Sequence, residues 1–132
     1  MNTQERAVID LVIIDDHPIK SLGVSRLLNR LPDMRVAAVC LTEEDAVEVI
    51  RRLQPKVVVA DLHNPRASIA KLTRAVHDAA EHARVIVVTK AFVDADHYRA
   101  SGAAGVVTES ALLRLADGIR EAVAGVPWVE YS

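Results

Sequence analysis

The chain has few of the residues that would tie it to an oxidising compartment, a membrane or a nucleic acid. Its one cysteine, Cys40, cannot form a disulfide within the chain, and its position at the end of an apolar run predicts a buried structural thiol. Aromatic residues make up 3% of the 132 residues, too few for a platform on which bases could stack. No apolar segment has the length of a membrane span or the pattern of a signal peptide. We therefore expect a cytoplasmic protein with no membrane attachment.

Strong charge and phosphate-binding loops are also missing. The net charge is −2 and no basic cluster occurs, so we expect no direct nucleic-acid binding by this segment. No glycine-rich loop of either common type follows the first predicted strand, which argues against nucleotide or dinucleotide binding. Flavin binding would require aromatic residues in the loops, where they are almost absent.

What the chain does have is an alternation of apolar runs and helical patterns. About half of its residues are apolar, enough to bury one core. The runs predict strands at residues 8–14, 35–40, 57–61, 84–88 and 105–107. Helices are predicted at 18–31, 43–53, 67–82, 95–100 and 111–124, with Thr42, Asp94 and Ser110 as N-caps. This order predicts an α/β fold, a five-stranded parallel doubly wound sheet in a flavodoxin-like three-layer sandwich over residues 1–124. Residues 125–132 are expected to form a C-terminal tail or the start of an interdomain linker.

One stretch organises the rest of the chain. Val57–Asp61 is an apolar run that stops at a carboxylate, which predicts a strand buried on both faces with Asp61 at its carboxyl end. An earlier apolar run repeats this design and ends in Asp15 and Asp16, and the fourth predicted strand ends at Thr89. Ligands of a doubly wound sheet bind at the carboxyl edge, where the strand order reverses. We therefore expect the three acids and Thr89 to share one cleft.

These residue types suit the chemistry of a phosphoryl group. Clustered carboxylates repel one another unless a cation joins them, and an all-oxygen site with room for water suits Mg²⁺. Asp61 is a potential nucleophile because carboxylates can form acyl phosphates, and the Thr89 hydroxyl could donate to a phosphoryl oxygen. Two other interpretations stay open. The aspartates could be helix caps and loop residues, or His17 and His63 could join them in a transition-metal site.

An enzyme is not expected. An aspartate-nucleophile phosphatase on a related sheet would need a second acid two residues after its nucleophile. Those places after Asp16 and Asp61 hold Pro18 and His63.

At this point the chain resembles the receiver domain of two-component response regulators over about residues 8–124. The matching features are an acidic pair, a phosphoacceptor aspartate followed by proline four residues on, a switch hydroxyl and a small-residue turn before the last strand: Asp15 and Asp16, Asp61 and Pro65, Thr89, and Gly102-Ala103-Ala104-Gly105. The turn Asp15-Asp16-His17-Pro18, followed by Gly23 and Leu27-Leu28, is most similar to the subfamily whose receiver precedes a LuxR-type helix-turn-helix.

The resemblance implies a metal site and a signal path. Asp15, Asp16 and Asp61 would hold Mg²⁺ with the backbone carbonyl of His63, and Asp61 would accept a phosphoryl group from a histidine kinase. Thr89 would then shift toward that group. The change would spread to the face formed by the elements predicted at 95–100, 105–107 and 111–124 and alter dimerisation or domain contacts. A homodimer is expected, with control of transcription through an absent or separate DNA-binding domain.

Three residues depart from the family pattern. Glu109 stands where the family has a lysine just after the fifth strand, and Val106 stands where it usually has a switch aromatic. A like charge within ~4 Å of a phosphoryl group would cost about 4 kcal/mol at an effective dielectric constant of about 20, where a lysine would gain a similar amount. Lys90 follows Thr89 directly, and its flexible stem could return a positive charge to the cleft or obstruct the phosphodonor.

The sequence leaves two functions open. The three acids and Thr89 favour a phosphoacceptor, whereas Glu109, Val106 and Lys90 favour an atypical receiver that acts as an interaction or dimerisation module without phosphorylation. The 132 residues include no basic helix-turn-helix, and we expect either a fragment of a transcription regulator or a free-standing receiver. The cognate kinase, the regulated genes and the dimer face cannot be read from the sequence.

Overall fold

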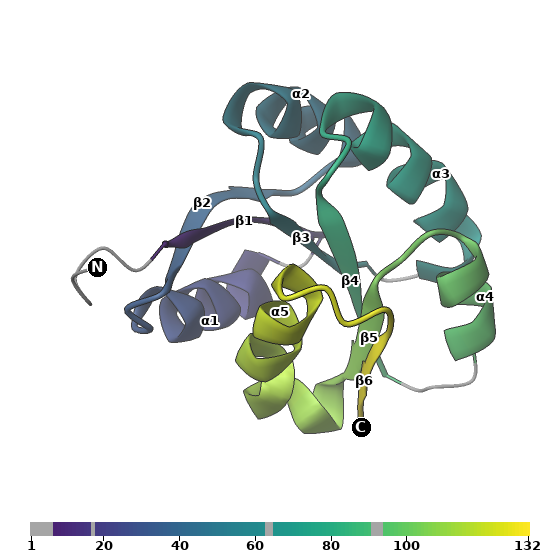
Figure 1. Ribbon diagram of the computed structural model, residues 1–132. Helices are drawn as coiled ribbons and strands as arrows, with labels where there is room; N and C mark the ends of the chain where they lie inside the picture. Colours follow the sequence, from purple (N-terminus) through teal and green to yellow (C-terminus); the bar gives the residue numbers. More distant parts are fainter. Residues whose placement is uncertain (1–6, 17, 63–64, 91–93) are drawn as a thin grey trace.

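The computed structural model describes residues 7–16, 18–62, 65–90 and 94–132, which form one parallel sheet between two layers of helices (Figure 1). The strands are β1 (Ile9–Asp15), β2 (Met34–Cys40), β3 (Val57–Asp61), β4 (Arg84–Thr89), β5 (Gly105–Thr108) and β6 (Val129–Tyr131). The helices are α1 (Pro18–Asn29), α2 (Glu43–Leu53), α3 (Pro65–Ala79), α4 (Ala95–Ala100), the 3₁₀ segment η2 (Glu109–Arg114) and α5 (Leu115–Val123). Within the described ranges, the sheet has six strands in the order β2-β1-β3-β4-β5-β6.

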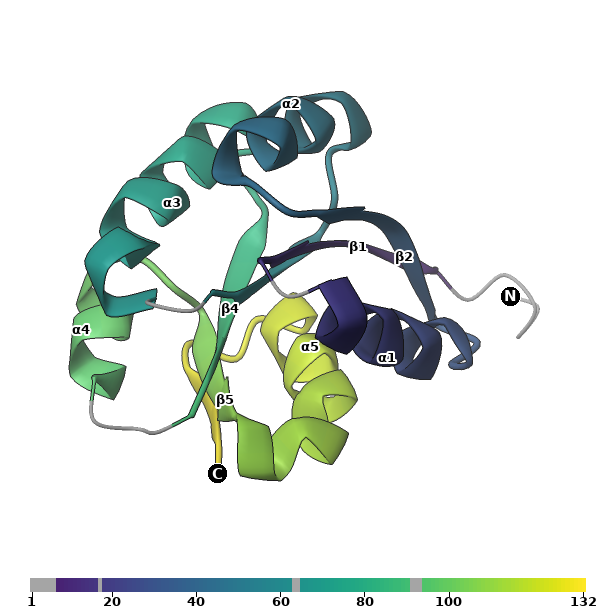
Figure 2. The ribbon, with the colours of Figure 1, turned by 180° about the vertical axis from the view of Figure 1, so that it is seen from behind.

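Both faces of the central strands are buried. Helices α1 and α5 cover one face of the sheet, and α2, α3 and α4 cover the other (Figures 1 and 2). Side chains alternate along a strand, so β1 sends Val12 and Ile14 into one core cluster and Leu11 and Ile13 into the other. Strand β3 is buried along its whole length. The α/β fold and the parallel sheet predicted from the sequence are therefore confirmed.

The helix starts agree only in part with the prediction. Thr42 caps α2, since its side chain accepts a hydrogen bond from the Asp45 backbone N–H at 3.2 Å. Asp94 stands at the N-cap position of α4 but makes no capping bond with its side chain. Ser110 does not cap the last helix, because η2 precedes α5 and the Ser110 hydroxyl instead shares a 3.0 Å hydrogen bond with Thr108.

The sheet has a sixth strand where five were predicted. Strand β6 comes from residues 125–132, the segment expected to be a tail or linker, and it pairs in parallel with β5. A Cβ atom on Gly105 would lie 2.6 Å from the Val129 carbonyl oxygen, so only glycine allows this close approach. At the end of β6, the Tyr131 hydroxyl donates to Glu121 of α5, and the Arg114 guanidinium stacks 4.5 Å from the Tyr131 ring centroid.

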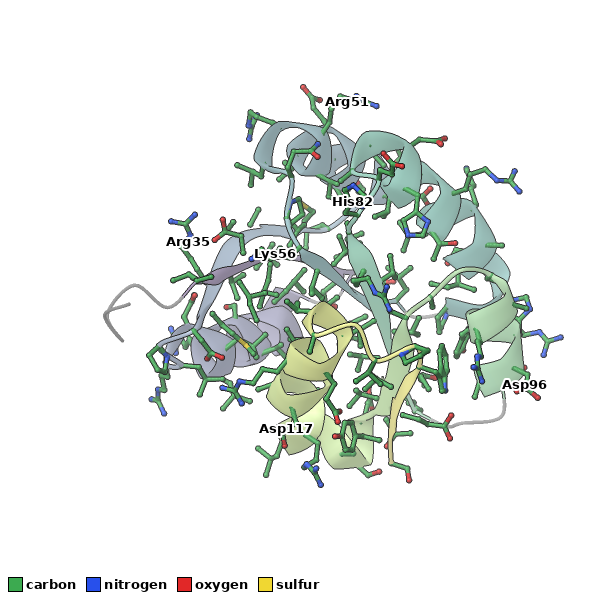
Figure 3. The ribbon with its side chains drawn as sticks, in the orientation of Figure 1. Arg35, Arg51, Lys56, His82, Asp96 and Asp117 are labelled. Atoms are coloured by element: carbon green, nitrogen blue, oxygen red, sulfur yellow. The ribbon has the colours of Figure 1, made fainter. Side chains whose placement is uncertain are left out.

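Charged side chains lie mainly on the outside of this sandwich. Arg35, Arg51 and Asp96 point away from the sheet in Figure 3. Cys40 is buried, as predicted, and burial, followed by the nearby Asp45 carboxylate, raises the pKa of its thiol. None of the helices in the described residues is long and apolar enough to cross a membrane.

Candidate functional site

Two carboxylates meet at the carboxyl edge of the sheet. Asp15 is the last residue of β1 and Asp61 the last of β3, and the two are register partners across the parallel pair. Their exposed fractions are 1% and 6%, which is unusual for aspartate. Neighbouring strands lie about 4.8 Å apart, so these two side chains share one environment. Two ionised carboxylates held this close repel each other, and a bound cation would relieve that repulsion.

The third predicted acid is not part of this buried pair. Asp16 follows β1 directly and is exposed. Within the described ranges, no group of three or more His, Cys, Asp or Glu side chains is arranged to hold a metal ion. The donors nevertheless have the right chemistry for a hard cation, because they are carboxylate oxygens and Mg²⁺ takes few protein ligands and keeps several waters. His63, whose backbone carbonyl is the other expected ligand, and His17, from the alternative transition-metal interpretation, lie outside the described residues.

The switch hydroxyl has an aromatic neighbour that the sequence analysis did not assign to it. Thr89 ends β4, next to β3, and Tyr98 of α4 forms a side-chain hydrogen bond with it. Tyr98 is 2% exposed and belongs to the same core cluster as Val106. Burial raises the pKa of the Tyr98 phenol, and the hydrogen bond with Thr89 acts in the opposite direction. The ring beside Thr89 therefore comes from α4, while Val106, where the resemblance implies an aromatic, is fully buried in β5.

Lys90 and Glu109 each directly follow the last residue of a strand, β4 and β5 respectively. Thr89 and Thr108 are register partners across β4 and β5, and Lys90 and Glu109 are the residues that follow them. Glu109 is half-buried at the start of η2, whereas Lys90 is exposed. The Glu109 carboxylate, where the resemblance implies a lysine, thus lies at the same edge as Asp61, two strands away.

The helices that follow Asp61 and Thr89 are joined to each other. Arg66, at the start of α3, forms an ion pair with Asp94 at the start of α4. His97 Nε2 lies 3.1 Å from the Arg66 carbonyl oxygen. Because Asp94 uses its carboxylate in this pair, it does not cap its own helix. The link joins the start of α3 to the start of α4.

The chain is similar to known proteins. Residues 11–110 match the family model described as the response regulator receiver domain. The response regulator GacA of Pseudomonas aeruginosa is 29% identical over 125 residues, which are 92% of this chain and 58% of GacA. The nitrate/nitrite response regulator protein NarL of Escherichia coli strain K12 is 35% identical over 65 residues, 49% of this chain and 29% of NarL.

Solved structures agree with these relatives. A two-component response regulator of the LuxR family from Aurantimonas sp. SI85-9A1 superposes with a TM-score of 0.82 at 29% identity, covering 92% of this chain and 89% of that one. The predicted similarity to receivers of LuxR-type regulators is confirmed. The chain spans little more than half of GacA, and less of NarL.

Proposed function

Since the chain belongs to the response regulator receiver domain family, we propose that it is an atypical receiver in which Asp61 is the phosphoacceptor. The observation that supports this best is the buried pair of Asp15 and Asp61 on adjacent strand ends. A carboxylate oxygen of Asp61 would bond to the phosphorus of a phosphohistidine while the P–N bond breaks and the imidazole leaves. The product is an acyl phosphate on Asp61.

Asp15, Asp16 and Asp61 would hold Mg²⁺ together with the backbone carbonyl of His63. The ion would supply positive charge to the phosphoryl oxygens and to the acids that hold it. Asp15 and Asp61 are already adjacent, whereas exposed Asp16 would have to turn toward them. The Thr89 hydroxyl would donate a hydrogen bond to one phosphoryl oxygen, and to do so it would exchange its contact with Tyr98.

Glu109 makes the site atypical. It is half-buried at the edge where the family places a lysine, and its negative charge opposes a phosphoryl group. Lys90 is the substitute cation within the same edge, and its exposure gives the ammonium freedom to reach the cleft. We expect phosphorylation that is weak and short-lived compared with a receiver that has the lysine.

The partners follow from this role. A histidine kinase would donate the phosphoryl group, and a homodimer would form or change when Asp61 is modified. Transcription would be regulated through an absent or separate DNA-binding domain. The chain covers 58% of GacA, and the activity of a whole regulator is part of the proposal. The domain itself is not expected to turn over a substrate, and we place it in the cytoplasm.

A second function is favoured by two observations at the same edge. Glu109 is half-buried there, and the described acids do not form a three-residue metal cage. A receiver of this kind would act as an interaction or dimerisation module without phosphorylation. Asp15 and Asp61 would then serve only to shape the edge.

Intact mass after incubation with acetyl phosphate, with and without Mg²⁺, separates these two functions. A gain of one phosphoryl group that requires Mg²⁺ and is lost in Asp61→Asn supports the phosphoacceptor. Asp10→Asn is the matched control, because Asp10 lies in the same strand as Asp15 but pairs with Arg35 at its opposite end, and it should be phosphorylated like the natural chain. No gain in a folded chain, both with acetyl phosphate and with phosphoramidate, would favour the module without phosphorylation.

A further inference from the structure

A pocket lies at the opposite edge of the sheet from Asp61. It has a volume of about 340 Å³ and is lined by His77, Glu81, His82, Arg84, Gly102 and Pro127, among others. Arg84 is the first residue of β4 and Thr89 the last, so the pocket and the switch hydroxyl are separated by about 16 Å along one strand. The pocket is therefore a second place on the molecule, and its size is in the range of small-ligand sites.

Arg84 has a charge that the described residues leave largely uncompensated. Its Nη2 donates to the Val126 carbonyl at 3.3 Å, and its Nε is buried with no hydrogen-bond partner in the described part of the chain. Arg120 shows what compensation looks like here, because its Nε and Nη2 bind both oxygens of Asp33 at 2.8 and 3.0 Å. A half-buried guanidinium without such a partner favours an anion that can accept from its fork of N–H groups.

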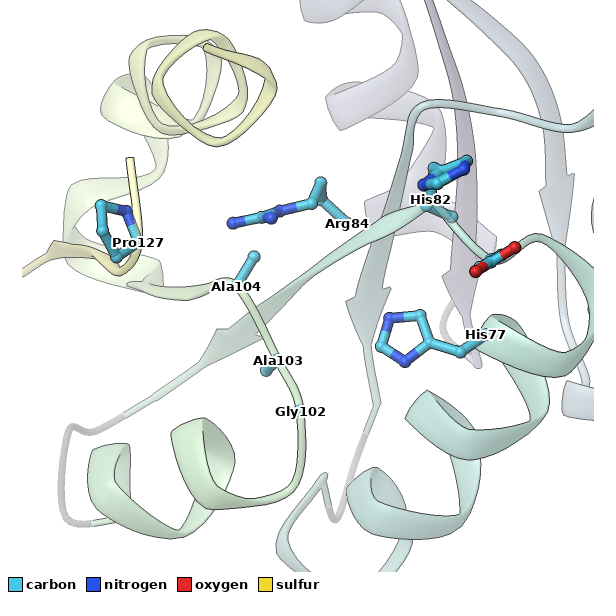
Figure 4. Close-up of a pocket in the computed structure, with 9 residues that line it drawn as sticks. His77, His82, Arg84, Gly102, Ala103, Ala104 and Pro127 are labelled. Atoms are coloured by element: carbon cyan, nitrogen blue, oxygen red, sulfur yellow. The ribbon is translucent and has the colours of Figure 1, made fainter. Parts of the chain in front are cut away.

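Two imidazoles line the same pocket as this guanidinium. In Figure 4, the Arg84 side chain extends toward Pro127 and away from His77 and His82, which border the pocket from the end of α3 and the turn that follows it. Each imidazole has an N–H that can donate to an oxygen atom in either protonation state. Gly102 keeps the space open beside His77, since a Cβ atom there would lie 3.7 Å from His77 Cε1.

The charge around the pocket also favours an anion. An adjoining pocket of about 340 Å³ shares His82 and Arg84 and adds Lys56. Glu81 is the opposing charge, and it is exposed, where water and salt screen it. Arg84 is less exposed than Glu81, so its charge acts more strongly inside the pocket.

We propose that this pocket binds a small oxyanion, a molecule whose phosphate, sulfate or carboxylate group is held by Arg84 in the space that His77 and His82 also line. The proposal is independent of phosphorylation at Asp61. Anion binding would give the domain a second ligand site, at the amino-terminal end of β4, the strand whose last residue is Thr89.

The test is a titration of the ¹⁵N-labelled chain followed by amide chemical shifts. Sodium sulfate, sodium phosphate and sodium succinate serve as separate probes, with sodium chloride holding the ionic strength constant so that general screening does not change. We expect saturable shifts at Gly102, Ala103 and Ala104 with at least one probe. Saturation by sulfate and phosphate alone identifies a tetrahedral oxyanion, and saturation by succinate alone identifies a carboxylate.

Substitutions test whether the anion binds in this pocket. Arg84→Gln should weaken anion binding at least tenfold. Arg26→Gln, which removes the same charge from an exposed position in α1, should change the affinity less than twofold. The double variant His77→Gln/His82→Gln should weaken binding at least threefold and decides the matter if Arg84→Gln does not fold. The proposal is wrong if none of the probes saturates, or if binding to the folded variants stays within twofold of the natural chain.

Discussion

The two halves of the carboxyl edge are built differently. The acid half, formed by the ends of β1 and β3, holds the buried pair Asp15 and Asp61 in register. The switch half, formed by β4, β5 and α4, holds Thr89 beside Tyr98, with Glu109 at the end of β5. The acid half has the acidic pair that the resemblance implies, whereas the switch half has Glu109 where the resemblance implies a lysine. The acidic pair alone therefore does not determine the function of this domain. The Glu109 charge and the Tyr98 ring at the same edge come from other elements, the end of β5 and α4.

The switch half also has an extra strand. β6 occupies the outer edge of β5, and Arg99 of α4 lies 5.7 Å from the ring centroid of Trp128, just before β6. Because Tyr131 bonds to Glu121 of α5, the segment contacts both helices that flank β5. The face that we expect to change on phosphorylation is therefore covered in part by β6.

The largest expected effect concerns the fit of β6 against β5. Gly105→Ala should lower the free energy of unfolding by about 2 kcal/mol, since its Cβ would meet the Val129 backbone at 2.6 Å and a strand would have to shift. Gly23→Ala is the control. Nothing lies within 4 Å of a Cβ at this position in α1, and alanine there should stabilise the chain by about 0.5–1 kcal/mol. Urea unfolding measures both, and equal effects of the same sign would mean that β6 does not need the close approach.

Reversing the charge at Glu109 should increase phosphorylation of Asp61. Glu109→Lys replaces repulsion of the phosphoryl group by attraction, and we expect at least tenfold more phosphorylated chain, which corresponds to about 1.4 kcal/mol. Intact mass after acetyl phosphate treatment measures it. Glu48→Lys makes the same change of charge at an exposed position in α2 and should have little effect on the amount of phosphorylated chain. If Glu109→Lys gives no gain, the departure at this position is not what limits the site.

The same contrast between halves explains what could be predicted from the sequence. The bounds of β3 were predicted to the residue, because a short apolar run that ends in a charged residue can be buried on both faces only as a central strand. The meeting of Asp15 and Asp61 follows from parallel order, which brings strand ends to one edge whatever side chains lie between. These features depend on local pattern and topology.

The features that were not predicted depend on contacts between elements. Tyr98 lies nine residues beyond Thr89, and nothing in the spacing shows that its hydroxyl returns to that threonine. β6 has three residues, too short a run for alternation to identify, and it follows a glycine and a proline that are typical of a linker. Asp94 is a residue type typical of helix caps, but its carboxylate forms an ion pair with Arg66, 28 positions earlier in the chain.

The hydrogen bond between Tyr98 and Thr89 should contribute a smaller amount. Tyr98→Phe keeps the ring and removes the hydroxyl, and we expect a loss of about 1 kcal/mol in the free energy of unfolding. Tyr131→Phe removes a hydroxyl that bonds to Glu121 at a more exposed position and should cost less. A double-mutant cycle with Thr89→Val tests the pair directly, and a coupling energy near zero would show that Tyr98 does not contact the switch hydroxyl.

The smallest effect is a dependence of stability on alkaline pH. Burial raises the pKa of Tyr98 above the ordinary value of 10.0, so the folded chain holds the phenol proton more tightly than the unfolded chain. Stability from this group is complete below pH 10 and is lost as pH rises through the folded pKa, because only the unfolded state then releases the proton easily. The pKa values of Cys40 and Tyr131 are also raised and act in the same direction. Urea unfolding from pH 9 to pH 11 should therefore show a steady loss of stability in the natural chain and a shallower loss in Tyr98→Phe. Equal slopes would mean that the Tyr98 hydroxyl reaches water and that the ring is not enclosed beside Thr89.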